Sequence, residues 1–343
     1  MANLHEVLKN KIGFGTAPLG NMFRDIPQDE ALATVEAAWN EGIRYFDTAP
    51  FYGAGLAESR LGEVLSQHPR DEFALSTKVG RLILDEEEEK NGGLFNHGRA
   101  NKIATDYTAD ATLRSIEESL TRLKTDRLDF VFIHDTSRDF LGDEWVAKFN
   151  EARTGAFRVL ARLQDEGVIN GWGLGVNTTE PIELAMDMDS AAPTMSLSAT
   201  QYTLLQHERA LQRMMPAAQA KGVGIVVGGP FNSGALLGGD YFDYAEIPPE
   251  VRERIARLTA IAGRYNVSLK AAALQFSAAH PAVAAVIPGS SRPERVAEDV
   301  AAMKAQIPGA FWNELLENKL ISAQAPCPAR CRRGVEGPCC QEG

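Results

Sequence analysis

Four residues have types and spacing that could transfer a proton: Asp47, Tyr52, Lys78 and His134. Asp47 ends the apolar run IRYF, and Tyr52 follows it across a loop broken by Pro50. An ammonium near a phenol favours the phenolate, so we expect Lys78 to lower the pKa of Tyr52 from about 10 toward neutrality. We predict that Tyr52 exchanges a proton with a substrate while Asp47 holds Lys78. His134 would orient the substrate oxygen, with no metal required.

Each of these residues also has a purely structural explanation. Asp47 and Lys78 could form a simple ion pair that Tyr52 covers, and a lone histidine is usually a satisfied core residue. His134, however, ends the apolar run LDFVFIH, where packing alone does not call for a histidine. Since all four lie at or just beyond the ends of predicted strands, we interpret them as one functional site.

The elements that must position these residues alternate between strands and helices. Apolar runs predict eight strands, at residues 11–20, 43–47, 73–78, 128–134, 169–176, 196–202, 223–228 and 283–287. Helical spacing predicts helices at residues 29–40, 57–65, 109–123, 157–166, 181–188, 210–220, 251–265, 271–279 and 293–305. This alternation favours the α/β class and a single closed (β/α)8 TIM barrel.

The main alternative is a doubly wound sheet of the Rossmann type. That fold needs GxGxxG at its first turn, and this chain has Pro18 where the third glycine should be. In a barrel, active sites gather at the carboxyl ends of the strands. The polar residues that end strands two to four would then face one another.

The segment at residues 80–106 interrupts the alternation of strands and helices. It contains an acidic run, residues 85–89, and two adjacent glycines. We predict a long loop or hairpin after strand three, and a solvated acidic face rather than a metal site.

Composition bounds the remaining possibilities. The formal net charge is -11, which argues against nonspecific binding to nucleic acid or to membrane surfaces. No apolar run approaches a membrane span and the start lacks a signal-peptide core, so a cytoplasmic location is the default expectation. All four cysteines lie at or after Cys327, in a segment rich in Pro, Gly and Arg. We predict a barrel over residues 1–328 and a disordered tail over 329–343.

Three motifs carry a resemblance to a known family: GIRYFDTAPFYG, STKVGR around Lys78, and DFVFIHD. Together with the barrel pattern, they resemble the aldo-keto reductase family over residues 11–328. GFGTAPLGN, IHD and GGPFNSGAL further resemble its branch of bacterial D-threo-aldose 1-dehydrogenases, which also covers L-fucose and pyridoxal dehydrogenases.

The resemblance implies hydride transfer to or from nicotinamide C4, with NADP(H), NAD(H) or both as cofactor. Tyr52 would transfer the proton, assisted by Lys78 and Asp47, and His134 would position the carbonyl or hydroxyl. Beyond these four, it implies a set of cofactor-binding residues: Asn177 and Gln201 at the carboxamide, Gly228 and Pro230 after strand seven, Ser290, Arg292 and Arg295 at the adenosine phosphates, and Glu298 and Asp299 toward the adenine. A helix beginning near Pro293 would add free amides for phosphate.

Two departures from the family pattern bear on the cofactor. Gly228 stands where members often carry an aromatic residue to stack on the nicotinamide, and Gly289 stands where NADP-dependent members often carry a lysine. We expect an oxidoreductase that interconverts a carbonyl and an alcohol, with an aldose or lactol as the leading substrate. A bulkier carbonyl, such as pyridoxal or a xenobiotic ketone, is the alternative. A non-catalytic nucleotide-sensing subunit is a second class, but the complete tetrad argues against it. We expect a monomer or weak homo-oligomer that binds a small molecule.

Overall fold

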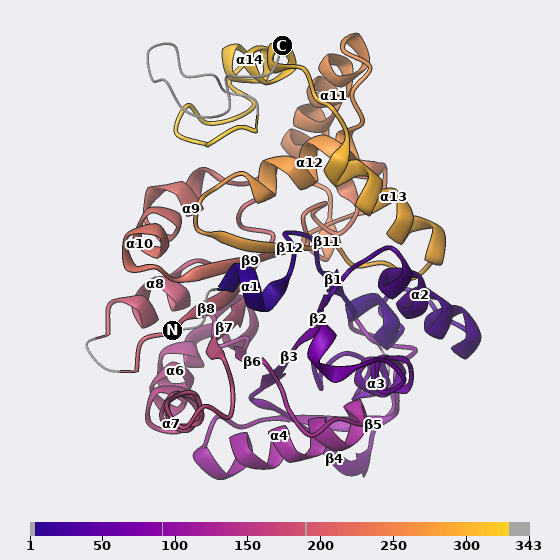
Figure 1. Ribbon diagram of the computed structural model, residues 1–343. Coiled ribbons are helices and arrows are strands. Elements are labelled where there is room, and N and C mark those ends of the chain that lie inside the picture. The colour runs from indigo at the N-terminus through magenta and orange to yellow at the C-terminus, as the bar shows by residue number, and fades with distance from the viewer. Residues whose placement is uncertain (1–3, 91, 189–190, 329–343) are drawn as a thin grey trace.

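Eight parallel strands form a barrel in the computed structural model, which describes residues 4–90, 92–188 and 191–328 (Figure 1). In spatial order the strands are β1 (Phe14–Gly15), β2 (Tyr45–Asp47), β3 (Ala74–Val79), β6 (Phe130–His134), β7 (Gly171–Val176), β8 (Met195–Ala199), β9 (Gly224–Gly228) and β12 (Val283–Ile287). Backbone hydrogen bonds between the first and last strand regions, including Gly13 N to Val286 O at 2.9 Å, close the barrel. The predicted (β/α)8 fold is therefore confirmed.

Helices surround the barrel and connect its strands (Figure 1). The longer ones are α2 (Gln28–Asn40), α3 (Leu56–Leu65), α4 (Ala109–Leu123), α6 (Trp145–Thr154), α7 (Ala156–Asp165), α8 (Glu180–Met186), α10 (Met214–Lys221), α11 (Pro249–Arg264), α12 (Leu269–Ala278), α13 (Pro293–Lys304) and α14 (Gly309–Glu317). Helix α4 has the bounds predicted from its apolar spacing, because Thr108 caps its first turn and Lys124 ends it in a left-handed conformation.

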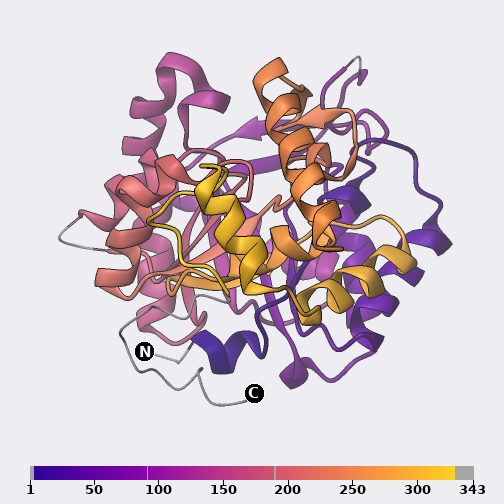
Figure 2. The same ribbon diagram turned by 90° about the horizontal axis from the view of Figure 1, so that it is seen from above.

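The barrel interior is filled by side chains of alternate strand positions, among them Tyr45, Phe130 and Phe132. The short helix α1 (Leu4–Leu8) covers the amino-terminal end of the barrel, and its Leu8 is buried in this inner cluster. Figure 2 shows α1 at one end of the barrel and the hairpin that follows β3 at the other. Helix α1 thus closes the amino-terminal end. The carboxyl ends of the strands, where active sites of such barrels lie, are called the barrel mouth below.

The segment after β3 is a hairpin of β4 (Arg81–Glu87) and β5 (Asn101–Thr105), in agreement with the predicted excursion. A second, unpredicted hairpin of β10 (Tyr241–Phe242) and β11 (Ala245–Glu246) follows β9. Helices α6 and α14 were also not predicted from the sequence.

Several predicted elements differ from the structure. The first strand, expected within residues 11–20, is confined to Phe14–Gly15, and Ala17–Gly20 forms a 3-10 helix. Strand β8 ends at Ala199, before the predicted limit at residue 202, because Thr200 adopts a left-handed backbone with φ of 61°. The predicted helix at residues 210–220 is two helices, α9 (Glu208–Gln212) and α10, which meet at Arg213.

The predicted disordered tail, residues 329–343, lies outside the described residues, so the division into a barrel and a tail stays a prediction. Within the described part of the chain, none of the helices is long and apolar enough to cross a membrane.

Candidate active site

The barrel mouth contains a fully buried ion pair between β2 and β3. Lys78 Nζ donates to Asp47 Oδ2 at 2.7 Å and to the Thr48 carbonyl oxygen at 2.8 Å. Ser76 Oγ donates to the second carboxylate oxygen of Asp47 at 2.7 Å. Burial raises the pKa of Asp47, and the Lys78 ammonium and the Ser76 hydroxyl oppose that rise. The predicted contact between Asp47 and Lys78 is therefore present.

Tyr52 lies on the loop after β2, with its ring centroid 4.8 Å from Lys78 Nζ. The loop is fixed by close backbone packing against the first β-to-α loop. A Cβ atom on Gly20 would lie 2.5 Å from the carbonyl carbon of Tyr52, and one on Gly53 would lie 2.3 Å from the Gly20 oxygen. Gly53 also has a positive φ of 65°, so a larger residue would displace the loop.

His134 ends β6 and faces Tyr52, with 5.9 Å between the ring centroids and an edge-on arrangement. The hydroxyl of Tyr107 donates to the His134 carbonyl oxygen at 2.7 Å and fixes the end of the strand. Burial, followed by the charges of Lys78 and Arg81, holds the pKa of His134 well below its usual range. His134 is therefore neutral near pH 7, with one N–H to donate.

The pKa of Tyr52 does not follow the expectation from the sequence. Burial raises it well above 10, and the charges of Asp47 and Asp135 raise it further. The expected net lowering of this pKa is contradicted, because burial is the largest effect on the phenol and Lys78 is paired with Asp47. A protonated Tyr52 is suited to donate its proton to a developing alkoxide.

A second buried ion pair, not predicted from the sequence, lies on the His134 side of the mouth. Arg81 Nη2 donates to Asp135 Oδ2 at 2.7 Å, and that oxygen lies 3.6 Å from His134 Nε2. The guanidinium also packs on Phe140, 3.3 Å from its ring centroid, and on Phe51 at 4.8 Å. Both charged residues belong to the motifs STKVGR and DFVFIHD, so their position beside Lys78 and His134 was the available signal.

A cavity of about 980 Å³ extends along the mouth from Asp47 and Tyr52 to Glu298 and Asp299. Its floor is rich in glycine, at positions 15, 228, 229, 234 and 289, which allows close approach to the backbone. One buried oxygen in its lining, Thr16 Oγ1, makes no hydrogen bond within the described chain, and Asp299 Oδ1 lies 3.2 Å from Lys270 Nζ. The cavity therefore has a volume and a polar lining that suit a dinucleotide.

Five of the predicted cofactor residues line this cavity: Gly228, Pro230, Arg295, Glu298 and Asp299. Burial raises the pKa of Asp299 to about 6, against the opposing charge of Lys270.

Lys270, at the start of α12, was not selected from the sequence. Its Nζ atom lies 2.5 Å from Glu298 Oε2 and 3.2 Å from Asp299 Oδ1, and its side chain lines the same cavity. No sequence pattern pointed to Lys270, because its helix lies outside the predicted phosphate-binding motif.

Four predicted cofactor residues do not line the cavity. Asn177 donates to Asp139 at 3.4 Å, and Gln201 donates to Thr200 and lines a different hollow, beside α9 and α11. Ser290 is buried and accepts from Arg292 N at 3.3 Å, which holds the turn before α13. The Arg292 side chain is exposed to solvent. The positions of these four side chains do not decide whether they bind the cofactor, so that role stays a prediction.

Aromatic side chains form the outer wall of the cavity. Phe23, after β1, stacks on Tyr241 of the β10–β11 hairpin with 5.7 Å between ring centroids. Phe231, which follows β9, and Tyr244, in the turn between β10 and β11, also line the cavity. They offer rings near the position where Gly228 lacks one.

Comparisons with known proteins agree with this geometry. The model of the Aldo/keto reductase family matches residues 11–318. The chain is 36% identical to D-threo-aldose 1-dehydrogenase of a Pseudomonas species, with 90% of this chain and 94% of the relative covered. It is 37% identical to pyridoxal 4-dehydrogenase of Microbacterium luteolum, with 91% and 94% covered.

A solved structure supports the same assignment. The holo form of an aldo-keto reductase from Bacillus halodurans aligns with a TM-score of 0.65 at 25% identity, with 91% of this chain and 92% of that chain covered. The barrel, the residues at its mouth and these relatives lead to one conclusion: the chain belongs to the aldo/keto reductase family and is an NAD(P)-dependent oxidoreductase.

Proposed function

We propose that the protein interconverts an aldose, in its carbonyl or lactol form, with the product of hydride transfer, and that Tyr52 exchanges the proton. The observation that carries the proposal is the arrangement of Tyr52 above the buried pair of Lys78 and Asp47, with neutral His134 facing it. The relative that acts on D-threo-aldoses supports the substrate class.

Each residue has a separate task in this proposal. In the reducing direction, His134 donates a hydrogen bond to the carbonyl oxygen, and Tyr52 gives its proton as the oxygen becomes an alkoxide. Lys78 stabilises the phenolate that remains, and Asp47 keeps Lys78 charged and in place. The nicotinamide cofactor supplies or accepts the hydride. In the oxidising direction the phenolate of Tyr52 accepts the hydroxyl proton.

The cavity residues support a nucleotide along the mouth. Arg295, Lys270 and the amino terminus of α13 are the positive groups at the end distant from Tyr52. Asp299 and Glu298 offer acceptors for ribose hydroxyls or the adenine amine. Asn177 and Gln201 remain candidates for the carboxamide, on the family resemblance alone.

A bulkier, flatter carbonyl substrate is the second candidate. The Phe95 ring lies 5.7 Å from the Tyr52 ring and 5.2 Å from the Phe51 ring, so aromatic surface borders the proton donor. The relative that oxidises pyridoxal fits this observation. Sugars also pack their C–H faces on aromatic rings, and the aldose proposal therefore accounts for the same wall.

The test is a spectrophotometric assay of the purified full chain with NAD(H) and NADP(H), in both directions. The panel holds aldoses, pyridoxal and simple ketones. We expect kcat/KM to be highest for an aldose. A protein that binds reduced nicotinamide but turns over none of the panel would support the non-catalytic alternative, and preference for pyridoxal would select the second candidate.

A further inference from the structure

The second ion pair at the barrel mouth, Arg81 with Asp135, has no task in the proton transfer described above. Two buried charges are costly to keep without a function, since apolar residues of similar volume are often equally stable. Asp135 also has a left-handed backbone with φ of 53°, a conformation that aspartate adopts more readily than most residues other than glycine. A buried charged residue next to His134 that has no part in the proton transfer is a candidate for a ligand contact.

The Asp135 carboxylate is held in place on one side only. Its Oδ2 accepts from Arg81, whereas its Oδ1 makes no hydrogen bond to any described residue. The side chain keeps 10% of its surface exposed, compared with 2% for Asp47 in the neighbouring pair. Asp135 therefore has a free acceptor at the mouth, and Asp47 has none.

The neighbouring donor is His134 Nε2, which lies 3.6 Å from Asp135 Oδ2. A carboxylate near Nε2 favours the tautomer that carries its proton there, so this nitrogen is a donor. The mouth thus presents a hydrogen-bond donor and an acceptor side by side. This spacing suits two oxygens on adjacent carbons of a substrate, where the reacting oxygen accepts from His134 and its neighbour donates to Asp135.

We propose that Asp135, fixed by Arg81, binds the hydroxyl group on the carbon next to the reacting carbon, and so selects α-hydroxy carbonyls, 1,2-diols and lactols. This inference rests on the proposed function and names the part of an aldose that the site recognises. Asp135 is a binding residue in this assignment, because the proton transfer stays with Tyr52. Arg81 is a positioning residue that keeps the carboxylate ionised and oriented.

The test compares substrates that differ only in that hydroxyl. D-arabinose and 2-deoxy-D-ribose form one pair, and glycolaldehyde and acetaldehyde form a second pair that does not depend on a sugar ring. For the wild-type protein we expect kcat/KM to be about 10- to 100-fold higher for the hydroxylated member of each pair, the range of a hydrogen bond to a charged group.

The variant replaces both charges at once, as Arg81→Met with Asp135→Leu, because removal of one partner would leave an unpaired buried charge. Methionine retains the packing against Phe51 and Phe140. We expect the ratio of kcat/KM values within each pair to fall to about one, mainly through loss of the hydroxylated substrate. Binding of NADH and NADPH, measured by fluorescence titration, should be unchanged.

A matched control replaces the ion pair at the opposite end of the barrel, as Arg70→Met with Asp129→Leu. That control should leave the substrate ratio at its wild-type value, whatever it does to stability. If the Arg81 and Asp135 variant keeps the wild-type ratio, or loses both members of a pair equally, the assignment of Asp135 is wrong. If no aldose is turned over by the wild-type protein, the proposed function itself fails, which is a different result.

Discussion

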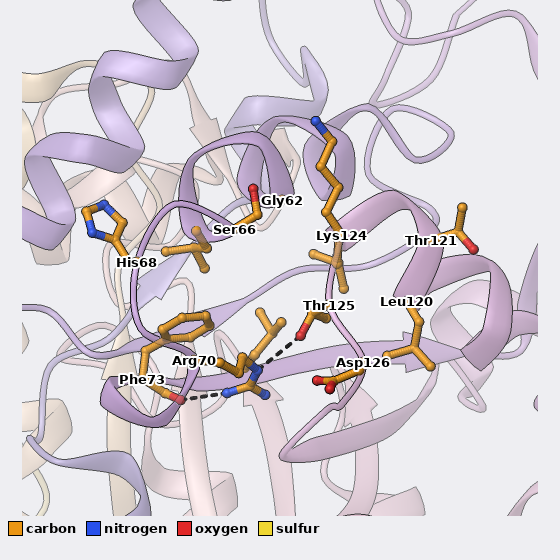
Figure 3. Close-up of a pocket in the computed structure, with 13 residues that line it drawn as sticks. Gly62, Ser66, His68, Arg70, Phe73, Leu120, Thr121, Lys124, Thr125 and Asp126 are labelled. Atoms are coloured by element: carbon orange, nitrogen blue, oxygen red, sulfur yellow. Dashed lines mark hydrogen bonds between the residues drawn. The ribbon is translucent and has the colours of Figure 1, made fainter.

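Two hollows on opposite ends of the barrel contain similar residue types but differ in how their polar groups are paired. The one at the amino-terminal end, about 520 Å³, lies between the carboxyl ends of α3 and α4 and is lined by His68, Arg70 and Lys124 among others (Figure 3). There Arg70 donates to Thr125, to two backbone carbonyls and to Asp129. Figure 3 shows the Lys124 side chain directed away from Arg70.

At the mouth, in contrast, some buried polar atoms lack a hydrogen bond within the described chain, among them Thr16 Oγ1, Arg81 Nε and His134 Nδ1. A buried polar group without a partner costs free energy, so a molecule that supplied partners at the mouth would be stabilised there. The charges at the amino-terminal end hold loops together, whereas those at the mouth leave polar atoms free for the ligand that we propose. The two ends therefore differ in how fully the arginine beside each hollow is hydrogen-bonded, and not in whether a hollow is present.

The largest expected effect on turnover comes from Tyr52→Phe. The substitution keeps the ring above Lys78 and removes only the phenolic proton, so kcat should fall by about 10²- to 10⁴-fold, the usual contribution of a general acid. Cofactor binding, followed by quenching of protein fluorescence, should change little. Near-wild-type kcat in this variant would remove Tyr52 from the proton transfer.

A smaller, selective effect is expected from Arg295→Ala. Arg295 lines the cavity, and a charged hydrogen bond to the 2′-phosphate of NADP(H) would contribute about 1.5 to 3 kcal/mol. The variant should therefore weaken NADP(H) by about 10- to 100-fold and spare NAD(H), as read from the ratio of kcat/KM values.

Arg292→Ala is the matched control for that experiment, since its side chain lies outside the cavity lining. We expect it to leave the cofactor ratio near the wild-type value. Equal losses for both cofactors in both variants would show that neither arginine reads the 2′-phosphate.

The pH dependence should differ between the two directions of the reaction. Because the pKa of Tyr52 is raised, the phenol stays protonated through neutral pH, and reduction should be flat from about pH 6 to 8. Oxidation needs the phenolate, so its kcat should rise by about tenfold per pH unit over the same interval. A plateau of the oxidation rate near pH 7 would indicate that bound substrate and cofactor lower this pKa.

The smallest effect on turnover is expected at the opposite end, from Asp129→Ala. Asp129 accepts from Arg70, from the Leu75 amide and from Asn170, and all three bonds are lost. The free energy of unfolding should fall by about 2 to 4 kcal/mol, measured by urea denaturation, while kcat stays unchanged.

Asp71→Ala, on the same end of the barrel, is the control. Its ion pair with Arg127 is solvent-exposed, so stability should change little. A loss of kcat in the Asp129 variant without a loss of stability would contradict the assignment of a structural role to the amino-terminal end and of catalysis to the mouth.

Much of the fold and several residues of the candidate site could be predicted from the sequence. An apolar run that ends in one charged or polar residue indicates both a buried strand and a residue at its carboxyl end, which is how Asp47, Lys78 and His134 were found. The barrel itself follows from eight repeats of that alternation. Each such pattern is contained in one short segment of the sequence, so it can be recognised without the structure.

The other features of the site depend on the three-dimensional surroundings of each residue. Burial sets the pKa of Tyr52, and no neighbour in the sequence reports burial. Arg81 and Asp135 are separated by 54 positions and each alone resembles a solvated charge. Gln201 was expected in a strand, but the left-handed Thr200 ends the strand and redirects the chain. Such outcomes arise from tertiary contacts, which the pattern of apolar residues does not specify.

The closure of the barrel constrains the order in which the protein can assemble. The first strand pairs with the last, and α1 packs against the far end of the chain, near Ala284 and Gly224. During synthesis the amino-terminal elements leave the ribosome first, yet their partners are translated near the end. Leu8 and its neighbours therefore stay exposed to solvent or to chaperones until β12 has been synthesised.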